Sequence, residues 1–330
     1  LSQRVRYNSE LQSLDSTVHD YYGMGKGQIE SLNGRKLHDL GFMGQGMTIA
    51  VLDAGFMNVD KIAAFRNLNI KGTHNFVAGY DNDVYKEMDH GTKTLSTIAM
   101  NQPTVFVGTA PKADFWLLRT EDYSTESPAE EDFWIAAVEF SDSVGVDIIS
   151  SSLGYHGFDD ISMNYRYADL NGRTAAISQA ASRLASKGMI LVNSAGNDGM
   201  GTWKKINVPA DAHDILTVGA VTLDKVNAPF SSIGPTADGR IKPDVMAYGC
   251  PTNVVSGRGY IIPDNGTSFA CPLIAGMVAC LWQACPNKSA KEILDIVRQS
   301  GNNCQSPDNI MGYGIPDFWS AYQAATRNNQ

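Results

Sequence analysis

Short, almost unbroken runs of apolar residues recur along the chain, and they constrain its fold more than any other feature. They lie at residues 47–52, 115–118, 146–149, 189–192 and 215–221. Runs of this length are typical of parallel strands that helices cover on both faces. Helical patterns separate several of them, so the sequence predicts an α/β fold with a mostly parallel central sheet.

The helical patterns have recognisable ends. One begins at Ser127, which forms a capping-box pattern with Pro at the first helical position. A second covers residues 171–187 and stops at Gly188, and a third begins at Ser289 and ends before Gly301. Residues 1–27 are polar and aperiodic, and no linker or repeat divides the rest. We therefore expect an N-terminal arm over residues 1–27 and one domain over residues 28–330.

Composition excludes several classes of protein. With 43% hydrophobic and 18% charged residues, the chain has enough apolar material for a large core. The formal net charge is −9 and no basic stripe occurs, which argues against nucleic acid or an anionic membrane as a partner. The longest clean apolar run, residues 273–282, is about half of what a membrane span needs, so no span is expected.

The five cysteines form no Cys-x-x-Cys pair, and an odd number cannot all pair with one another. We expect buried thiols with at most one disulfide. The first residue is Leu1 rather than Met, from which we expect a trimmed N-terminus with any signal peptide outside the sequence.

Four positions carry groups that could perform chemistry. Asp53 ends the first strand, and His90 opens a helical segment beside Gly91. Ser268 lies in the first turn of an apolar helix, where free N–H groups and the helix dipole stabilise an anion. Asn197 lies in a turn of small residues after a strand. Taken singly, each has an ordinary structural explanation as a turn former or helix cap.

Together the four positions form a pattern. Asp, His and Ser follow one another in the chain order of subtilisin, which differs from the chymotrypsin and α/β-hydrolase orders. The surrounding motifs are Ala-Val-Leu-Asp-Ala-Gly, His-Gly-Thr, Ser-Ala-Gly-Asn and Gly-Thr-Ser-Phe-Ala-Cys-Pro. On these motifs the chain resembles the subtilisin-like serine protease family over residues 28–326, and the motif set is similar to that of bacterial members.

The resemblance implies a three-layer α/β/α fold and a role for each residue. Ser268 would be the nucleophile and His90 the general base. Asp53 would orient and stabilise the imidazole. The Asn197 side chain and the Ser268 backbone N–H would form the oxyanion hole.

The resemblance also implies a substrate cleft. One wall would pair with an extended peptide, and the other would enclose the primary specificity pocket. The first comprises Ser151, Ser152, Leu153 and Gly154, and the second Ser194, Ala195 and Gly196. We expect the pocket floor near residues 199–203. Residues 155–170 look like an insertion, which either forms a rim over the cleft or packs as a surface loop.

The sequence departs from the family pattern at three motif positions. Ala54, Phe269 and Cys271 replace residues that are more usual there, and we expect activity to survive. The loop at residues 101–104 lacks the form of a tight calcium loop, and the acidic loop at 80–83 is better explained as solvated. No cofactor is required, no metal ligands are predicted, and the sequence gives structural calcium little support.

The sequence therefore predicts a secreted or cell-envelope serine endopeptidase that cleaves protein or peptide substrates through an acyl-enzyme. It is expected to be a monomer, with a removed pro-segment or an inhibitor as a further partner. Two alternatives stay open: a catalytically silent relative that binds peptides, and an esterase or peptide ligase that uses the same acyl-enzyme.

Overall fold

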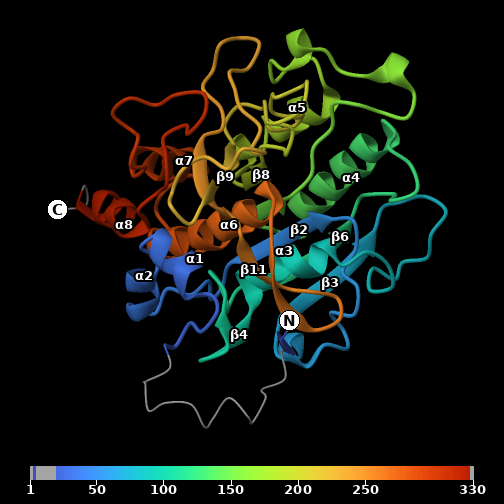
Figure 1. The fold of residues 1–330 in the computed structure, drawn as a ribbon. Helices are drawn as coiled ribbons and strands as arrows, with labels where there is room; N and C mark the ends of the chain where they lie inside the picture. Colours follow the sequence, from blue (N-terminus) through green and yellow to red (C-terminus); the bar gives the residue numbers. More distant parts are fainter. Residues whose placement is uncertain (1–2, 5–19, 328–330) are drawn as a thin grey trace.

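Seven parallel strands form the central sheet of the computed structural model, which describes residues 3–4 and 20–327. The strand order is β10-β9-β8-β7-β2-β6-β3, with β2 near the middle (Figure 1). The sheet comprises β2 (Thr48–Asp53), β3 (Asn69–Asn75), β6 (Asp114–Arg119), β7 (Ile148–Ser151), β8 (Ile190–Ser194), β9 (Leu216–Thr222) and β10 (Val245–Cys250). The predicted α/β class and parallel sheet are confirmed, and the five apolar runs became β2, β6, β7, β8 and β9.

Helices cover both faces of this sheet, which confirms the three-layer arrangement. One face carries α3 (His90–Ala99) and α6 (Thr267–Ala284), and the other carries α4 (Ala129–Ser143) and α5 (Ala176–Ala181). Alternate residues of β2 enter opposite cores: Ile49 and Val51 face the α6 side, and Ala50 and Leu52 the α4 side. Burial on both faces explains why these strands are almost wholly apolar.

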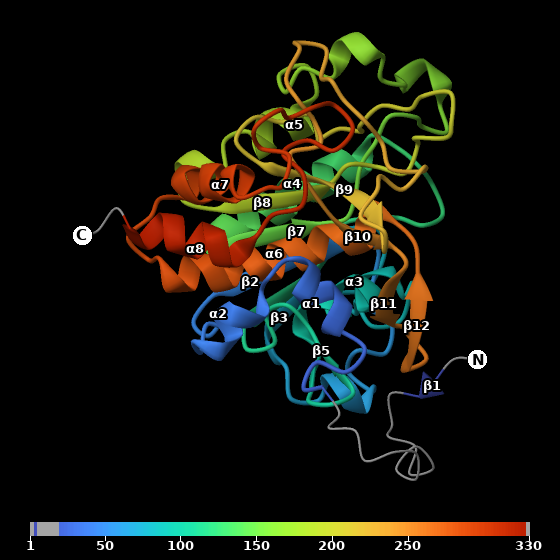
Figure 2. The same ribbon diagram turned by 60° about the vertical axis from the view of Figure 1, so that its left-hand side comes forward.

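The remaining elements surround these layers. Figure 2 shows α7 (Ala290–Gln299) and α8 (Phe318–Arg327) beside α6. Two short helices, α1 (Lys26–Ser31) and α2 (Arg35–Asp39), lie near the start of the described chain. Two small antiparallel sheets complete the fold: β4 (Asn101–Gln102) with β5 (Phe106–Val107), and β1 (Gln3–Arg4) with β12 (Tyr260–Asp264) and β11 (Thr252–Val255).

Two of the three predicted helices occur at full length. Ser289 caps α7 in a reciprocal capping box with Glu292. The capping box predicted at Ser127 is wrong: Pro128 is itself the N-cap of α4, no side chain of the described residues caps it, and only the Ser127 N–H bond to Glu130 Oε2 forms. The single helix expected over residues 171–187 is wrong: α5 spans six residues, and a separate 3-10 turn, Ala185–Lys187, precedes Gly188. Gly188 does adopt the left-handed conformation, with φ of 89°, that suits a helix stop.

Most of the predicted arm, residues 1–27, lies outside the described residues. Its described C-terminal part packs against the domain: Tyr22 is 2% exposed, and its hydroxyl lies 3.1 Å from His38 Nδ1. The Met24 N–H donates to the Val105 carbonyl. Folded contacts therefore begin before residue 28, and the boundary of the arm stays a prediction.

The long apolar helix α6 is a core element. Its 18 residues are long and apolar enough to cross a membrane by composition, yet 83% of that stretch is buried inside the protein. All five cysteines are free thiols, with Cys271 and Cys280 buried in this helix. Burial raises the pKa of the Cys271 thiol to about 12, which keeps it protonated.

A buried ion triad ties the sheet to α7. Asp244 accepts from Lys242 Nζ at 2.7 Å and from Arg298 Nε at 2.8 Å. Burial opposes ionisation of Asp244, but the two cations outweigh it and lower its pKa.

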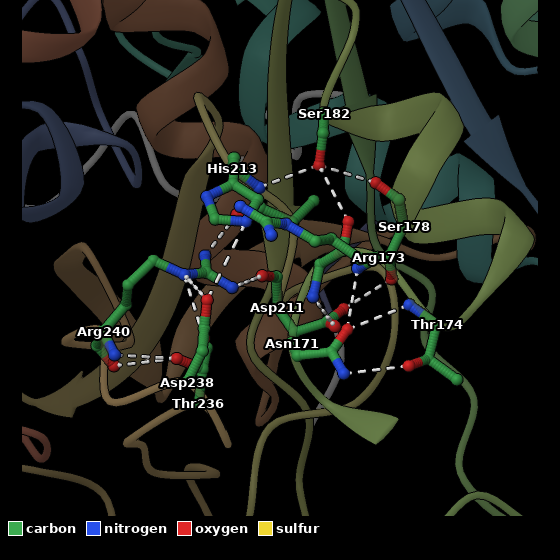
Figure 3. Close-up of polar contacts among 12 residues, drawn as sticks. Asn171, Arg173, Thr174, Ser178, Ser182, Asp211, His213, Thr236, Asp238 and Arg240 are labelled. Carbon is green, nitrogen blue, oxygen red and sulfur yellow. Dashed lines mark hydrogen bonds and ion pairs between the residues drawn. The ribbon is translucent and has the colours of Figure 1, made fainter. Parts of the chain in front are cut away.

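A second buried carboxylate anchors the chain that follows residues 155–170 (Figure 3). Asp211, which is fully buried, accepts from the Gly172 N–H at 2.7 Å and from Ser178 Oγ at 2.5 Å. Arg240 in turn donates to the carbonyls of Asp211 and Ala212. These bonds fix the chain that follows the insertion to α5 and to the loop that carries Asp211.

Candidate active site

Asp53 ends β2 at the carboxyl edge of the sheet, the edge where parallel α/β folds gather functional groups. Its side chain is fully buried between neighbouring strands. Both oxygens are engaged: Oδ1 lies 2.7 Å from His90 Nδ1 and accepts from the Ala54 N–H, and Oδ2 accepts from Thr94 Oγ1 at 2.9 Å. The carboxylate is therefore fixed in one orientation that faces His90.

His90 is the first residue of α3, and its side chain is 31% exposed. Gly91 makes this placement possible, because a Cβ there would lie 2.4 Å from the Gly55 carbonyl oxygen. Burial disfavours the imidazolium, but the charge and hydrogen bond of Asp53 outweigh burial and raise the pKa of His90. A carboxylate on Nδ1 leaves Nε2 as the nitrogen that can exchange a proton with a substrate or nucleophile.

Ser268 is the second residue of α6 and is 8% exposed. Its Oγ lies 3.5 Å from the Ser152 carbonyl, and its own carbonyl accepts from Ser152 Oγ at 2.8 Å. Within residues 20–327 no hydrogen bond joins Ser268 Oγ to His90. His90 instead contacts the next residue along the chain, since the rings of His90 and Phe269 have centroids 5.7 Å apart.

Asn197 lies beside the start of α6, and Thr267 holds it there. Asn197 Oδ1 accepts from the Thr267 N–H at 2.9 Å and from Thr267 Oγ1 at 3.0 Å. Because Oδ1 takes both bonds, the NH₂ group is the end of the amide left to act as a donor. The neighbouring Ser268 N–H has no partner in the described chain, as expected in the first turn of a helix. Thr267 was not predicted as a site residue; its only sequence signal is its place before Ser268.

A cavity of about 430 Å³ opens beside Ser268 and Asn197. Five of the seven predicted substrate-binding residues line it, namely Ser152, Leu153, Gly154, Ser194 and Gly196. The other two, Ser151 and Ala195, are fully buried and do not line it. Ser151 instead accepts a hydrogen bond from Trp134 Nε1, because the alternation of β7 turns its side chain into the α4 core.

The predicted floor at residues 199–203 is wrong, since none of these residues lines the cavity. The lining there comes from Asp198 and Asn207, joined by a hydrogen bond of 3.0 Å from Asn207 Nδ2 to Asp198 Oδ2. Trp203 lies behind this lining, and its ring stacks on that of His156 with the two centroids 4.7 Å apart. Sequence reasoning missed Asp198, Asn207 and His156 because three separate segments bring them together.

The insertion at residues 155–170 combines the two arrangements that the sequence left open, a rim over the cleft and a packed surface loop. His156 and Gly157 line the cavity, and Glu126, from the loop before α4, lines it as well. The Glu126 backbone bonds to Asp159, which ties that loop to the insertion. Phe158 packs between Tyr155 and Tyr165. Residues 155–170 thus form a rim and also carry a small packed cluster of their own.

The described residues contain no group of three or more His, Cys, Asp or Glu side chains that could hold a metal ion. In the acidic loop, Lys86 Nζ lies 2.6 Å from Asp81 and 3.4 Å from Asp83. A lysine between the two carboxylates does not suit a calcium site.

Comparison with known proteins gives consistent matches. The model of the subtilase family matches residues 44–314. Subtilisin NAT of Bacillus subtilis subsp. natto is 28% identical over 283 residues, which are 85% of this chain and 67% of that protein. Subtilisin Savinase of Lederbergia lenta is 27% identical over 292 residues, 88% of this chain and 94% of that protein. The structure of MycP1 from Mycobacterium smegmatis has a TM-score of 0.70 at 21% identity, covering 94% of this chain and 86% of that one, and so shares its fold.

Proposed function

The chain belongs to the subtilase family, and from that premise we propose that it is a serine endopeptidase that forms an acyl-enzyme on Ser268. One arrangement carries the proposal: the fixed Asp53–His90 pair lies against Phe269, the residue after Ser268, and Ser268 and Asn197 line a cavity. Nucleophile, base, orienting carboxylate and oxyanion donors are the parts that acyl transfer needs.

Each residue has a role in the proposed reaction. His90 Nε2 takes the proton of Ser268 Oγ as that oxygen attacks the peptide carbonyl, and later returns it to the leaving amine. Asp53 holds the Nδ1–H tautomer and stabilises the imidazolium. The Asn197 amide and the Ser268 N–H donate to the oxygen that becomes negative. Water then repeats the sequence to release the acyl group.

The hydroxyl of Ser268 must turn from the Ser152 carbonyl toward His90 before attack. Its bond to that carbonyl is long at 3.5 Å and therefore weak, so the turn costs little. Catalytic hydrogen bonds are often long without substrate and shorten in the Michaelis complex. The neutral His90 that the reaction requires is the dominant form above its raised pKa.

Substrate would bind as an added strand along residues 152–154. Gly154, outside any strand, has neither backbone group bonded to the backbone of the described residues. Free N–H and C=O groups beside a catalytic serine are what an extended peptide pairs with. The single domain, the monomeric state, the pro-segment and the location outside the cytoplasm stay predictions.

Labelling with a fluorophosphonate tests the proposal directly. Attack by an activated serine on phosphorus expels fluoride and leaves a covalent adduct, which intact mass spectrometry detects. We expect one adduct on the wild type and none on Ser268→Ala. Absence of an adduct on folded wild-type protein would overturn the proposal and favour the silent peptide-binding relative. Turnover of esters without peptides would favour the esterase or ligase.

A further inference from the structure

We propose that the cavity beside Ser268 selects a positively charged side chain, lysine or arginine, at the residue that supplies the scissile carbonyl (P1). The inference rests on the proposed function, because it names the substrate class of that same site. Two carboxylates line the cavity, and neither pairs with a lysine or an arginine within the described residues.

Two carboxylates line the cavity and no lysine or arginine does. Asp198 is 29% exposed, and its partners are neutral or weak: the Asn207 amide at 3.0 Å and His156 Nδ1 at 4.0 Å. Glu126 forms no side-chain hydrogen bond or ion pair in the described part of the chain. The cavity therefore has a negative potential that its own residues do not neutralise.

The carboxyl of Glu126 ionises less readily than a free glutamate side chain. The side chain is exposed overall, but partial desolvation of its carboxyl and the nearby charge of Asp159 raise its pKa. A bound ammonium or guanidinium group would reverse this effect, because an opposite charge nearby favours the ionised carboxylate.

One lining residue, Asn207, also carries a buried acceptor atom behind the cavity surface. Asn207 is 8% exposed, and its Oδ1 is buried with no hydrogen-bond partner in residues 20–327. That oxygen belongs to the amide whose nitrogen binds Asp198, so an unused acceptor lies beside the carboxylate. Lysine and arginine bring several N–H donors and no acceptor, which complements this arrangement.

An apolar P1 side chain would fit this lining poorly. Leu153 is the only large apolar residue that lines the cavity in the described structure, and the other lining residues are polar or glycine. An apolar side chain would take water away from Asp198 and Asn207 without replacing its hydrogen bonds, which is costly. Pockets built for polar recognition reject analogues that leave their groups unpaired.

Steady-state kinetics with matched peptides tests the proposal. The peptides differ only at P1, which is Arg, citrulline, Lys, norleucine or Phe; citrulline keeps the shape of Arg without its charge. We expect kcat/KM for Arg to exceed that for citrulline by tens to about a hundredfold. Added salt is expected to reduce the ratio.

Three variants separate the pocket from general charge effects. Asp198→Asn is expected to lower the Arg-to-citrulline ratio at least tenfold, and Glu126→Gln less, because Glu126 is exposed. Asp142→Asn makes the same change of net charge on an exposed residue at the far end of α4, and should leave the ratio unchanged.

The outcomes distinguish the two proposals. If Ser268 takes the fluorophosphonate but citrulline or Phe peptides are cleaved as fast as Arg peptides, the cationic pocket is refuted and the peptidase stands. If Ser268 takes no label, competition binding of the Arg and citrulline peptides to Ser268→Ala still decides. Equal affinities would refute the pocket, and about tenfold tighter binding of Arg would support it.

Discussion

Replacement of Thr267 by valine tests whether this residue positions Asn197, the proposed oxyanion donor. Thr267 holds Asn197 Oδ1 through its N–H at 2.9 Å and through its hydroxyl at 3.0 Å. Valine has nearly the same shape but no hydroxyl, so one of the two bonds is lost. A neutral hydrogen bond contributes about 1 kcal/mol, which corresponds to roughly 5- to 10-fold in rate. We therefore expect kcat to fall about 5- to 10-fold with KM almost unchanged.

The size of this effect has an upper bound. Removal of the oxyanion-hole amide costs about 100- to 1000-fold in kcat, a figure measured in subtilisin itself. Asn197→Ala should approach that loss, and Thr267→Val should stay well below it because the backbone bond remains. Thr267→Ser keeps the hydroxyl and is the matched control, with kcat near that of the wild type.

A double-mutant cycle gives the decisive measurement. Since Thr267 acts through Asn197, Thr267→Val should have no further effect on kcat when Asn197 is already alanine. Urea unfolding of each variant measures the loss of stability at Gly196, whose N–H donates to the Thr267 hydroxyl at 3.3 Å and whose carbonyl is a second acceptor for it at 3.2 Å. Additive effects on kcat, or a rise in KM instead of a fall in kcat, would refute the positioning role.

Three further predictions concern charge. Asp53→Asn should lower kcat about 10⁴-fold. The acid limb of the kcat/KM profile lies above pH 6.5 in the wild type, because the pKa of His90 is raised, and should move to lower pH in the variant. An unmoved limb would contradict the Asp53–His90 pairing. Burial raises the pKa of Glu131 to about 7, so this carboxyl binds its proton more tightly in the folded protein. The free energy of unfolding should therefore fall as the pH rises from 4.5 to 7. Glu131→Gln keeps an acceptor for the Tyr165 hydroxyl but does not titrate. Urea unfolding at pH 8 should therefore show the variant free of this destabilisation, which amounts to up to about 3 kcal/mol. Asp244→Ala leaves the buried Lys242 without its carboxylate, whereas the partly exposed Arg298 keeps Asp295, and should cost about 3–5 kcal/mol. Because folding lowers the pKa of Asp244, the stabilisation by its carboxylate is complete above pH 4 and is lost as the pH falls through the folded pKa. The free energies of unfolding of the wild type and Asp244→Ala should therefore converge at low pH.

The central strands and the candidate site residues could be predicted from the sequence because their signals are local. Burial on both faces forces an almost continuous apolar run, as in β2, and a capping box identifies the start of α7. The helix expected over residues 171–187 failed for the opposite reason. Its alanine-rich composition favours a helix, but the Gly172 N–H bonds to the buried Asp211 carboxylate, and only Ala176–Ala181 is α-helical before a separate 3-10 turn.

The sequence by itself determined the fold class, the family motifs and the candidate residues Asp53, His90, Asn197 and Ser268, since each lies in a short segment with its own pattern. Only the tertiary structure decided which groups surround them. Thr267 meets Asn197, and Asp198 meets Asn207 and His156, across separations that no local pattern records. Hydrogen bonds and electrostatic potential depend on distances of a few ångströms, and those distances arise only when the strands and loops have packed.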